Sequence, residues 1–321
     1  MRVFVAGATG AIGRRLVPQL VARGHTVIAT TRKVDKLAGL RSAGATPIVL
    51  DPLDAMAVGD AVARAEPQAI VHQLTALSEK PNLRHFDRWF STTNELRTRG
   101  TEYLLAAAQG ADVSCLVAQS YTGWTNARTG GPIKGEDDPF DTQPLKEQSE
   151  TLAAIRFLER AVTEAPLEGI VLRYGNFYGS GDLDSMIEVI RKRQLPIIGD
   201  GAGVWSWIHL EDAAAATVAA LERGNQGIYN ITDDEPAPVT EWLPFLADVV
   251  GAKPPLRVPV WLARILAGRV AVQWMTEGRG ASNAKAKREL NWRPAWRTWR
   301  EGFRDEFAAS PNGAVNEPVS E

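Results

Sequence analysis

Short apolar stretches alternate with longer amphipathic stretches through the first two-thirds of the chain. In the longer stretches apolar residues recur three and four positions apart, which is typical of helices with one buried face. The predicted strands are residues 3–6, 26–30, 46–50, 69–74, 113–119 and 169–174, and the predicted helices are residues 11–22, 33–43, 54–63, 85–109 and 145–163. Strands and helices that alternate in this order predict an α/β protein with a doubly wound parallel sheet.

The composition changes after Gly175, where tryptophan and proline become more frequent. Large aromatic side chains dominate small cores, so this change predicts a second, smaller α/β lobe. We expect a sheet domain of residues 1–175 with residues 205–232 returning to it, a lobe of residues 176–204 and 233–308, and a tail of residues 309–321. The tail contains proline, glycine and few large apolar side chains, so we expect it to be disordered.

The charge balance and the cysteine content exclude several functional classes. The 36 Lys and Arg residues against 38 Asp and Glu give a formal net charge of −2, which provides no broad cationic field for a nucleic acid. No apolar stretch reaches the roughly 18 residues needed to cross a bilayer, so we expect no contact with a membrane. Cys115 is the single cysteine, which excludes an intrachain disulfide and favours a reducing cytoplasm with no metal site.

A glycine-rich turn follows the first predicted strand and opens the first predicted helix. It reads Gly7-Ala-Thr-Gly-Ala-Ile-Gly13. Glycines permit a tight turn and the close approach of a pyrophosphate, whose charge the free N–H groups and the helix dipole then stabilise. Strand, turn and helix in this order predict a Rossmann dinucleotide site. We expect the cofactor to be bound at this turn by Gly7, Thr9, Gly10, Ala11, Ile12 and Gly13.

The end of the second predicted strand indicates which nicotinamide cofactor binds. An acidic residue there normally accepts hydrogen bonds from the ribose of NAD, whereas basic residues accommodate the 2′-phosphate of NADP. This strand ends Ala29-Thr-Thr-Arg-Lys33, without a carboxylate. A phosphate would meet Thr31, Arg32 and Lys33, and a guanidinium can bind it through two parallel hydrogen bonds. The sequence therefore favours NADP over NAD.

Several further motifs occur in a characteristic order along roughly residues 1–305. They are Asp51-Pro-Leu-Asp54, Gly100-Thr-Glu-Tyr-Leu-Leu105, Leu172-Arg-Tyr-Gly-Asn-Phe-Tyr-Gly179, Gly199-Asp-Gly201, Trp207-Ile-His-Leu-Glu-Asp212 and Asn283-Ala-Lys-Ala-Lys-Arg-Glu-Leu-Asn-Trp292. Together with the G-x-x-G-x-x-G spacing, the chain resembles the extended and atypical short-chain dehydrogenases/reductases, the family of NAD(P)-dependent epimerases and dehydratases.

The resemblance implies positions for the rest of the cofactor and for a partner subunit. Asp51 and Leu53 would lie near the adenine, and Gln73, Leu74 and Thr75 near the second ribose. Tyr174, within one of the matching motifs, is also expected to contact the cofactor. The superfamily further suggests a homodimer through the helices predicted over residues 85–109 and 145–163.

The expected catalytic triad is incomplete. In the superfamily a Ser or Thr orients the substrate oxygen, a Tyr exchanges its proton, and a Lys four residues later holds the ribose and lowers the pKa of the tyrosine. The resemblance places Ser120 at the first position, but Lys146 and Glu150 at the other two, and no Tyr-x-x-x-Lys lies nearby. We expect Tyr121 either to replace the missing proton donor or to line the pocket. Lys146 would either polarise a carbonyl or lie exposed to solvent, and Glu150 would accept hydrogen bonds from ribose hydroxyls.

The predicted substrate pocket is apolar. In sugar-nucleotide epimerases the segment that corresponds to residues 199–207 supplies an Arg to the substrate diphosphate, whereas this chain has Trp205. An indole can stack on a flat ligand but cannot neutralise two phosphates. Trp124, Tyr178 and Trp205 are expected to line the pocket, joined by Met186 and Trp274.

These observations favour an NAD(P)-dependent oxidoreductase that transfers a hydride to or from a small carbonyl or hydroxyl compound. Two alternatives stay open. A nucleotide-sugar epimerase or dehydratase would need a phosphate anchor that the sequence does not provide. A non-catalytic NADP-binding sensor would need no proton donor.

Overall fold

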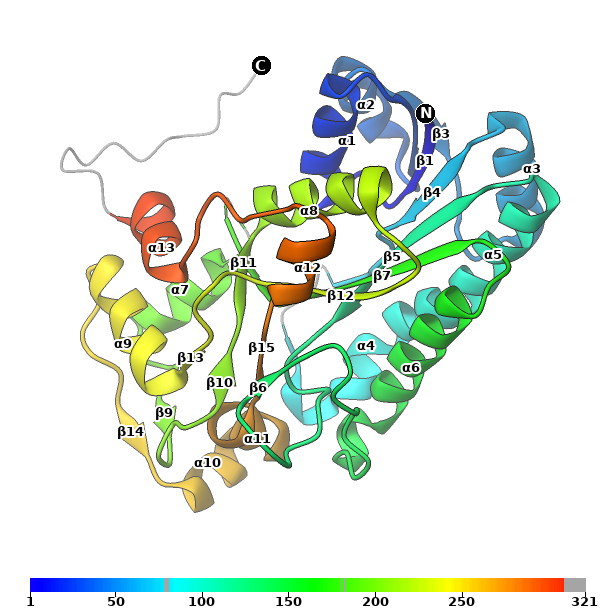
Figure 1. Cartoon of the computed structure of the whole chain (residues 1–321). Helices are drawn as coiled ribbons and strands as arrows, with labels where there is room; N and C mark the ends of the chain where they lie inside the picture. Colours follow the sequence, from blue (N-terminus) through cyan, green and yellow to red (C-terminus); the bar gives the residue numbers. More distant parts are fainter. Residues whose placement is uncertain (78–80, 180, 182, 309–321) are drawn as a thin grey trace.

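The computed structural model describes residues 1–77, 81–179, 181 and 183–308. Within these residues the main sheet has seven strands, all parallel, in the order β12-β7-β5-β4-β1-β2-β3 (Figure 1). They are β1 (Arg2–Ala6), β2 (Thr26–Thr31), β3 (Thr46–Val49), β4 (Ala69–His72), β5 (Cys115–Tyr121), β7 (Glu168–Tyr174) and β12 (Gly227–Ile231). The predicted doubly wound sheet is confirmed.

Helices cover both faces of this sheet (Figure 1). On one face lie α1 (Gly13–Ala22), α2 (Leu37–Ser42) and α8 (Leu210–Arg223), and on the other lie α3 (Ala55–Ala65), α4 (Phe86–Glu95), α5 (Thr101–Gly110) and α6 (Ser149–Thr163). The alternation of β1 shows why. Val3 and Val5 belong to the apolar core under α1 and α8, and Phe4 belongs to the core under α3 and α5. Both faces of the strand are apolar, so both must be covered.

The helix predicted over residues 85–109 is interrupted. The π-helical turn η3 (Leu96–Gly100) joins α4 to α5. A π-helical turn holds one more residue than an α-helical turn, and such turns are frequent at functional sites. The helix predicted from residue 145 also starts later, at Ser149, after the short turn η4 (Lys146–Gln148). Its amide groups at Glu150 and Thr151 donate to the carboxylate of Asp87, which caps this start.

A second apolar core lies in the C-terminal part of the chain. The centre of this core is formed by five fully buried side chains, those of Trp207, Trp242, Trp299, Tyr178 and Phe303.

The remaining elements are β6 (Ile133–Lys134), β8 (Asn176–Tyr178), α7 (Asp184–Arg191), β9 (Ile197–Ile198), β10 (Val204–Trp205), β11 (Trp207–His209), β13 (Ala237–Pro238), α9 (Val239–Val249), β14 (Arg257–Val258), α10 (Val260–Leu266), α11 (Arg269–Glu277), β15 (Gly280–Ala281), α12 (Ala284–Glu289), α13 (Trp299–Phe307), and the short turns η1 (Val34–Lys36) and η2 (Leu83–His85).

The chain crosses between the two cores more than once. After β8 it builds part of the second core, and it then returns through β11 and α8 to β12 at the edge of the main sheet. No helix among the described residues is both long and apolar enough to span a bilayer. The tail predicted for residues 309–321 lies outside the described residues.

Candidate functional site

The glycine turn after β1 leaves no room for side chains. Gly7 has a φ of +94°, which an L side chain rarely adopts, and a Cβ there would lie 2.6 Å from the carbonyl oxygen of Gln73. A Cβ on Gly13 would lie 2.3 Å from the carbonyl oxygen of Gly7. The amide of Gly10 closes the turn by donating to that same oxygen at 3.1 Å. The turn therefore presents bare backbone to whatever binds above it.

The start of α1 suits an anion. The helix begins at Gly13, no side chain caps it at Ile12, and its first turn carries no acidic residue. Uncapped N–H groups and the positive end of the helix dipole stabilise a phosphate at such a position. Thr9 and Ala11 are half-buried in the same turn. The donor set fits the pyrophosphate of a dinucleotide, although the structure contains no ligand.

The end of β2 lies beside this turn. The Thr9 and Thr31 hydroxyls lie 3.4 Å apart, and one donates to the other. Thr31 is buried, whereas Arg32 and Lys33 are exposed just beyond it. No carboxylate ends this strand. Beyond β3, the exposed Asp51 accepts a hydrogen bond from the amide of Leu53 at 3.0 Å. The side chains at the end of β2 are thus hydroxyl-bearing and basic, as a 2′-phosphate requires.

The segment after β4 runs alongside the turn, and it corrects one prediction. Leu74 and Thr75 are half-buried, whereas Gln73 is buried and donates from Nε2 to the Tyr174 hydroxyl at 3.3 Å. Tyr174 has no exposed surface, and its hydroxyl lies 2.7 Å from that of Thr217. Tyr174 is thus packed inside the core, where its hydroxyl accepts the hydrogen bond from Gln73. The predicted direct contact of Tyr174 with the cofactor is therefore wrong.

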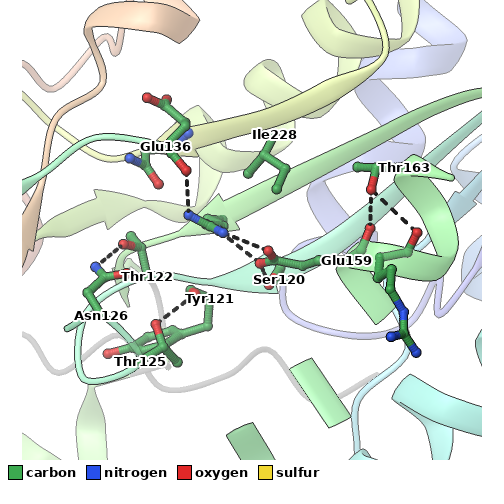
Figure 2. Close-up of polar contacts among 12 residues, drawn as sticks. Ser120, Tyr121, Thr122, Thr125, Asn126, Glu136, Glu159, Thr163 and Ile228 are labelled. Carbon is green, nitrogen blue, oxygen red and sulfur yellow. Dashed lines mark hydrogen bonds and ion pairs between the residues drawn. The ribbon is translucent and has the colours of Figure 1, made fainter. Parts of the chain in front are cut away.

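Ser120 does not face a substrate. Its hydroxyl donates to Oε1 of Glu159 at 2.6 Å, and both residues are buried (Figure 2). Glu159 also forms a two-pronged ion pair with Arg173, at 2.9 Å and 2.7 Å. Consecutive residues of a strand point to opposite faces, and Ser120 lies on the face that α6 covers. The predicted orienting role of Ser120 is therefore replaced by an internal hydrogen bond.

Tyr121 points the other way, to the cavity side. Its hydroxyl donates to Oδ1 of Asn176 at 3.2 Å, and Nδ2 of Asn176 donates to the carbonyl oxygen of Ser206 at 3.1 Å. The second bond fixes the amide so that its oxygen faces the phenol. Burial raises the pKa of Tyr121 above its ordinary value, so the phenol keeps its proton at neutral pH. Asn176 lies inside a matching motif, but sequence analysis did not select it.

Lys146 and Glu150 are both exposed. Lys146 lies in the turn η4 that precedes α6, and Glu150 is the second residue of α6. Neither lines the cavity beside Tyr121, so the structure does not bring the predicted carbonyl-polarising lysine or the ribose-binding glutamate to that cavity. Within α6, the first buried positions four residues apart are Thr151 and Ile155. The Thr151 hydroxyl donates to Asp87 at 2.6 Å. The inward face of α6 thus carries neither a phenol nor an ammonium near its start.

A narrow cleft opens beside Tyr121. The indole of Trp205 donates to the carbonyl oxygen of Trp274 at 3.0 Å, and the rings of Trp124 and Trp274 stack with centroids 6.4 Å apart. None of the lining side chains is charged. The lining residues are Tyr121, Gly123, Trp124, Asn176, Val204, Trp205, Trp274 and Gly278.

Tyr178 does not belong to this cavity. It is fully buried in the second core, where its ring packs edge-on against Trp207 and Phe303. The predicted contact of Tyr178 with substrate is therefore wrong. Met186 packs against the same core, so it is not a cavity residue either.

The family can now be assigned. The model of the NAD dependent epimerase/dehydratase family matches residues 3–232. The chain belongs to this family. Its relatives include a 3-diazoavenalumate denitrifying reductase from Streptomyces, 41% identical over 94% of this chain and 99% of that protein. A 4-hydroxy-2-methyl-3-oxo-4-farnesyl-3,4-dihydroquinoline-1-oxide ketoreductase from Stigmatella aurantiaca is 28% identical over 83% of this chain and 79% of that protein.

Solved structures of other family members share the fold. UDP-glucose 4-epimerase from Thermotoga maritima superimposes with a TM-score of 0.74 at 21% identity, covering 95% of this chain and 96% of that one. Human epimerase family protein SDR39U1, solved with NADPH, gives 0.72 at 22% identity, covering 96% and 99%. This family member is therefore an NAD(P)-dependent oxidoreductase with a small-molecule substrate. Its neighbours in structure bind NAD or NADPH.

Proposed function

We propose that this family member is an NADPH-dependent reductase of an uncharged, flat or largely apolar small molecule. The observation that carries the proposal is the cavity itself. It is lined by Trp124, Trp205 and Trp274, it contains no charged side chain, and the protonated phenol of Tyr121 opens into it. Indoles offer large apolar faces on which a flat substrate can stack, and few polar groups then fix its orientation.

The proposed cofactor domain comprises residues 1–175 together with residues 205–232, and the remaining described residues form the substrate lobe. The glycine turn would hold the pyrophosphate, and Thr31, Arg32 and Lys33 would hold the 2′-phosphate that distinguishes NADP from NAD. The exposed basic pair and the lack of a carboxylate at the end of β2 support this assignment. Asp51 and Leu53 would lie near the adenine, and Gln73, Leu74 and Thr75 near the second ribose.

In the proposed mechanism Tyr121 is the proton donor. When bound, the reduced cofactor supplies the hydride that the electrophilic atom of the substrate accepts. The Tyr121 hydroxyl donates its proton to the neighbouring heteroatom, and solvent returns a proton to the phenolate. Asn176 holds the phenol in place through the bond at 3.2 Å. The raised pKa keeps the proton on Tyr121 at neutral pH, so the phenol is in the form that can donate it.

The cavity does not favour a nucleotide-sugar substrate. A diphosphate needs a cation, and the neighbouring guanidinium groups are already engaged. Arg279 donates to the carbonyl oxygens of Glu277 and Arg128, and Arg128 pairs with Asp141 and Glu277. Reductases among the relatives support the same choice, since one is named for a ketone and one for a diazo compound. We therefore infer that the reducible group is a ketone, an aldehyde or a diazo group.

The test is oxidation of NADPH by the purified protein, followed at the absorbance of the reduced nicotinamide. The compounds tested as substrates are aromatic and aliphatic ketones, aldehydes, diazo compounds and UDP-glucose. We expect turnover with flat apolar members and none with UDP-glucose. Tyr121→Phe should lower kcat/KM on the best substrate by about 10²-fold or more, because general acid catalysis contributes about 10²–10⁴-fold. Tyr103→Phe on α5 is the matched control, because it removes a phenol hydroxyl that accepts a hydrogen bond from Arg99 on η3.

Each alternative outcome has a defined meaning. NADPH binding without turnover on any compound would instead support a non-catalytic sensor. Epimerisation leaves the cofactor unchanged overall, so UDP-glucose is also followed by chromatography. Its conversion to UDP-galactose without net oxidation of NADPH would support an epimerase. If Tyr121→Phe kept the wild-type rate, another group would be the proton donor and the mechanism would be wrong.

A further inference from the structure

Arg97 carries a buried guanidinium that forms no ion pair with the residues that the structure describes. The side chain is only 5% exposed and lies at the π-helical turn η3. Its Nη1 atom has no hydrogen-bond partner, and the described residues supply no ion pair to it. The guanidinium lies over the ring face of Phe90, 5.5 Å from the centroid. A buried cation of this kind is costly unless it is paired, so the free donor calls for a ligand.

The groups around Arg97 cannot serve as that partner. Burial lowers the pKa of His72 to about 4, so the imidazole is neutral at pH 7, and both ring nitrogens are engaged by Thr101 and by the amide of Leu74. Glu159 is the carboxylate that acts on Arg97 electrostatically. It is already bound by Arg173 and by the hydroxyl of Ser120. The guanidinium therefore keeps a net positive charge, since burial lowers its pKa only to about 10.

The place of Arg97 in the fold points to the cofactor. The turn η3 packs against α6, and a Cβ at its last residue, Gly100, would lie 3.9 Å from Leu74. Leu74 belongs to the segment that we expect beside the second ribose. The superfamily resemblance places an ammonium near the start of α6 for the same ribose, but the inward face there carries Thr151 and Ile155. The cation is missing from α6 and is present on the turn that packs against it.

We propose that Arg97 binds the nicotinamide half of the cofactor and donates hydrogen bonds to its ribose hydroxyls. From its place on η3, Arg97 would do what a lysine on the neighbouring helix does in the superfamily. The inference rests on the proposed NADPH-dependent function. A planar guanidinium with several donors can hold two vicinal hydroxyls at once.

The experiment compares Arg97→Met with Arg97→Lys and with the control Arg99→Met. Arg99 lies on the same turn but is exposed, where it contacts Glu95 and Tyr103. Calorimetry measures the binding of NADPH and of adenosine 2′,5′-bisphosphate, which lacks the nicotinamide half. Thermal unfolding without ligand is recorded for every variant. We expect Arg97→Met to weaken NADPH binding about 10- to 100-fold and to leave bisphosphate binding within about twofold. Its melting temperature should not fall, because the variant removes an unpaired buried charge.

Arg97→Lys should recover part of the lost NADPH affinity, and Arg99→Met should behave as wild type. Unchanged NADPH binding in Arg97→Met would overturn the inference. So would an equal loss of both ligands, or a fall in melting temperature with intact NADPH binding, since a structural arginine would give either result. An increased substrate KM with unchanged NADPH binding would assign Arg97 to the substrate instead. If the wild-type protein bound neither ligand, the proposed function would fail before this inference was reached.

Discussion

Replacing Ser120 by alanine separates the two roles that this hydroxyl could have. As a substrate-orienting group it would act on the reaction and contribute little to folding. In the structure it donates to Glu159 deep in the protein, so its removal should act on stability and spare the reaction. The substitution deletes one oxygen and adds no atom, so it tests the hydroxyl without crowding the site.

The magnitude follows from the geometry of the hydrogen bond. The distance is 2.6 Å, the acceptor is a carboxylate, and both residues are buried. A hydrogen bond to a charged group contributes about 1.5–3 kcal/mol. Glu159 keeps its two bonds to Arg173, so the carboxylate is not left unpaired and the loss should lie at the lower end. We expect Ser120→Ala to lower the free energy of unfolding by about 1–2 kcal/mol, which corresponds to about 2–5 °C in melting temperature.

The assay is thermal unfolding and steady-state kinetics on the same preparations. The control is Ser114→Ala, which removes an exposed hydroxyl just before β5 that donates to the carbonyl oxygen of Gln68. We expect kcat/KM of Ser120→Ala to stay within about twofold of wild type, and the control to change neither quantity. A loss of 10²-fold in kcat with an unchanged melting temperature would refute this reasoning, because it would mean that the hydroxyl meets the substrate.

Two further predictions concern the cofactor and the pH dependence of folding. Arg32→Ala should weaken NADPH binding about 10-fold or more and NADH binding by less than about twofold, because the hydrogen bond to a phosphate is charge-assisted. Arg41→Ala on α2 is the control. Equal weakening of both cofactors would contradict the 2′-phosphate assignment. Burial lowers the pKa of His72 from 6.5 to about 4, so the unfolded chain binds the proton more readily. The free energy of unfolding should therefore fall by up to about 3 kcal/mol as the pH drops from about 6.5 to about 4. Chemical denaturation at a series of pH values measures this change, and His72→Gln should remove the contribution of His72 to it.

The sheet and the glycine turn could be predicted because their signals are local. Apolar runs of strand length recur between amphipathic stretches, and backbone geometry converts that alternation into parallel strands with covering helices. The turn between Gly7 and Gly13 depends on residues that are adjacent in the sequence. The end of β2 is equally local, since Thr31, Arg32 and Lys33 follow one another directly. None of these features needs a partner from elsewhere in the chain.

The predicted catalytic residues depended on directions that the sequence does not contain. Ser120 and Tyr121 are neighbours on β5, and the strand turns one toward α6 and the other toward the cavity. The position of the cap at Asp87 decides where α6 starts, and this start places Thr151 and Ile155 on the inward face and leaves Lys146 outside. Without a Tyr-x-x-x-Lys motif, no local pattern specifies which residues of α6 face inward.

The sequence by itself determined the alternation of strands and helices along the chain, the bare backbone for a pyrophosphate and the basic end of β2, because short-range patterns specify them. The tertiary structure decided which side chains share a space. Asn176 reaches Tyr121, and Arg97 forms no ion pair within the described part of the chain, only because elements far apart in the sequence pack in one relative orientation. A side chain's partners are set by that packing, and packing is a property of the whole chain.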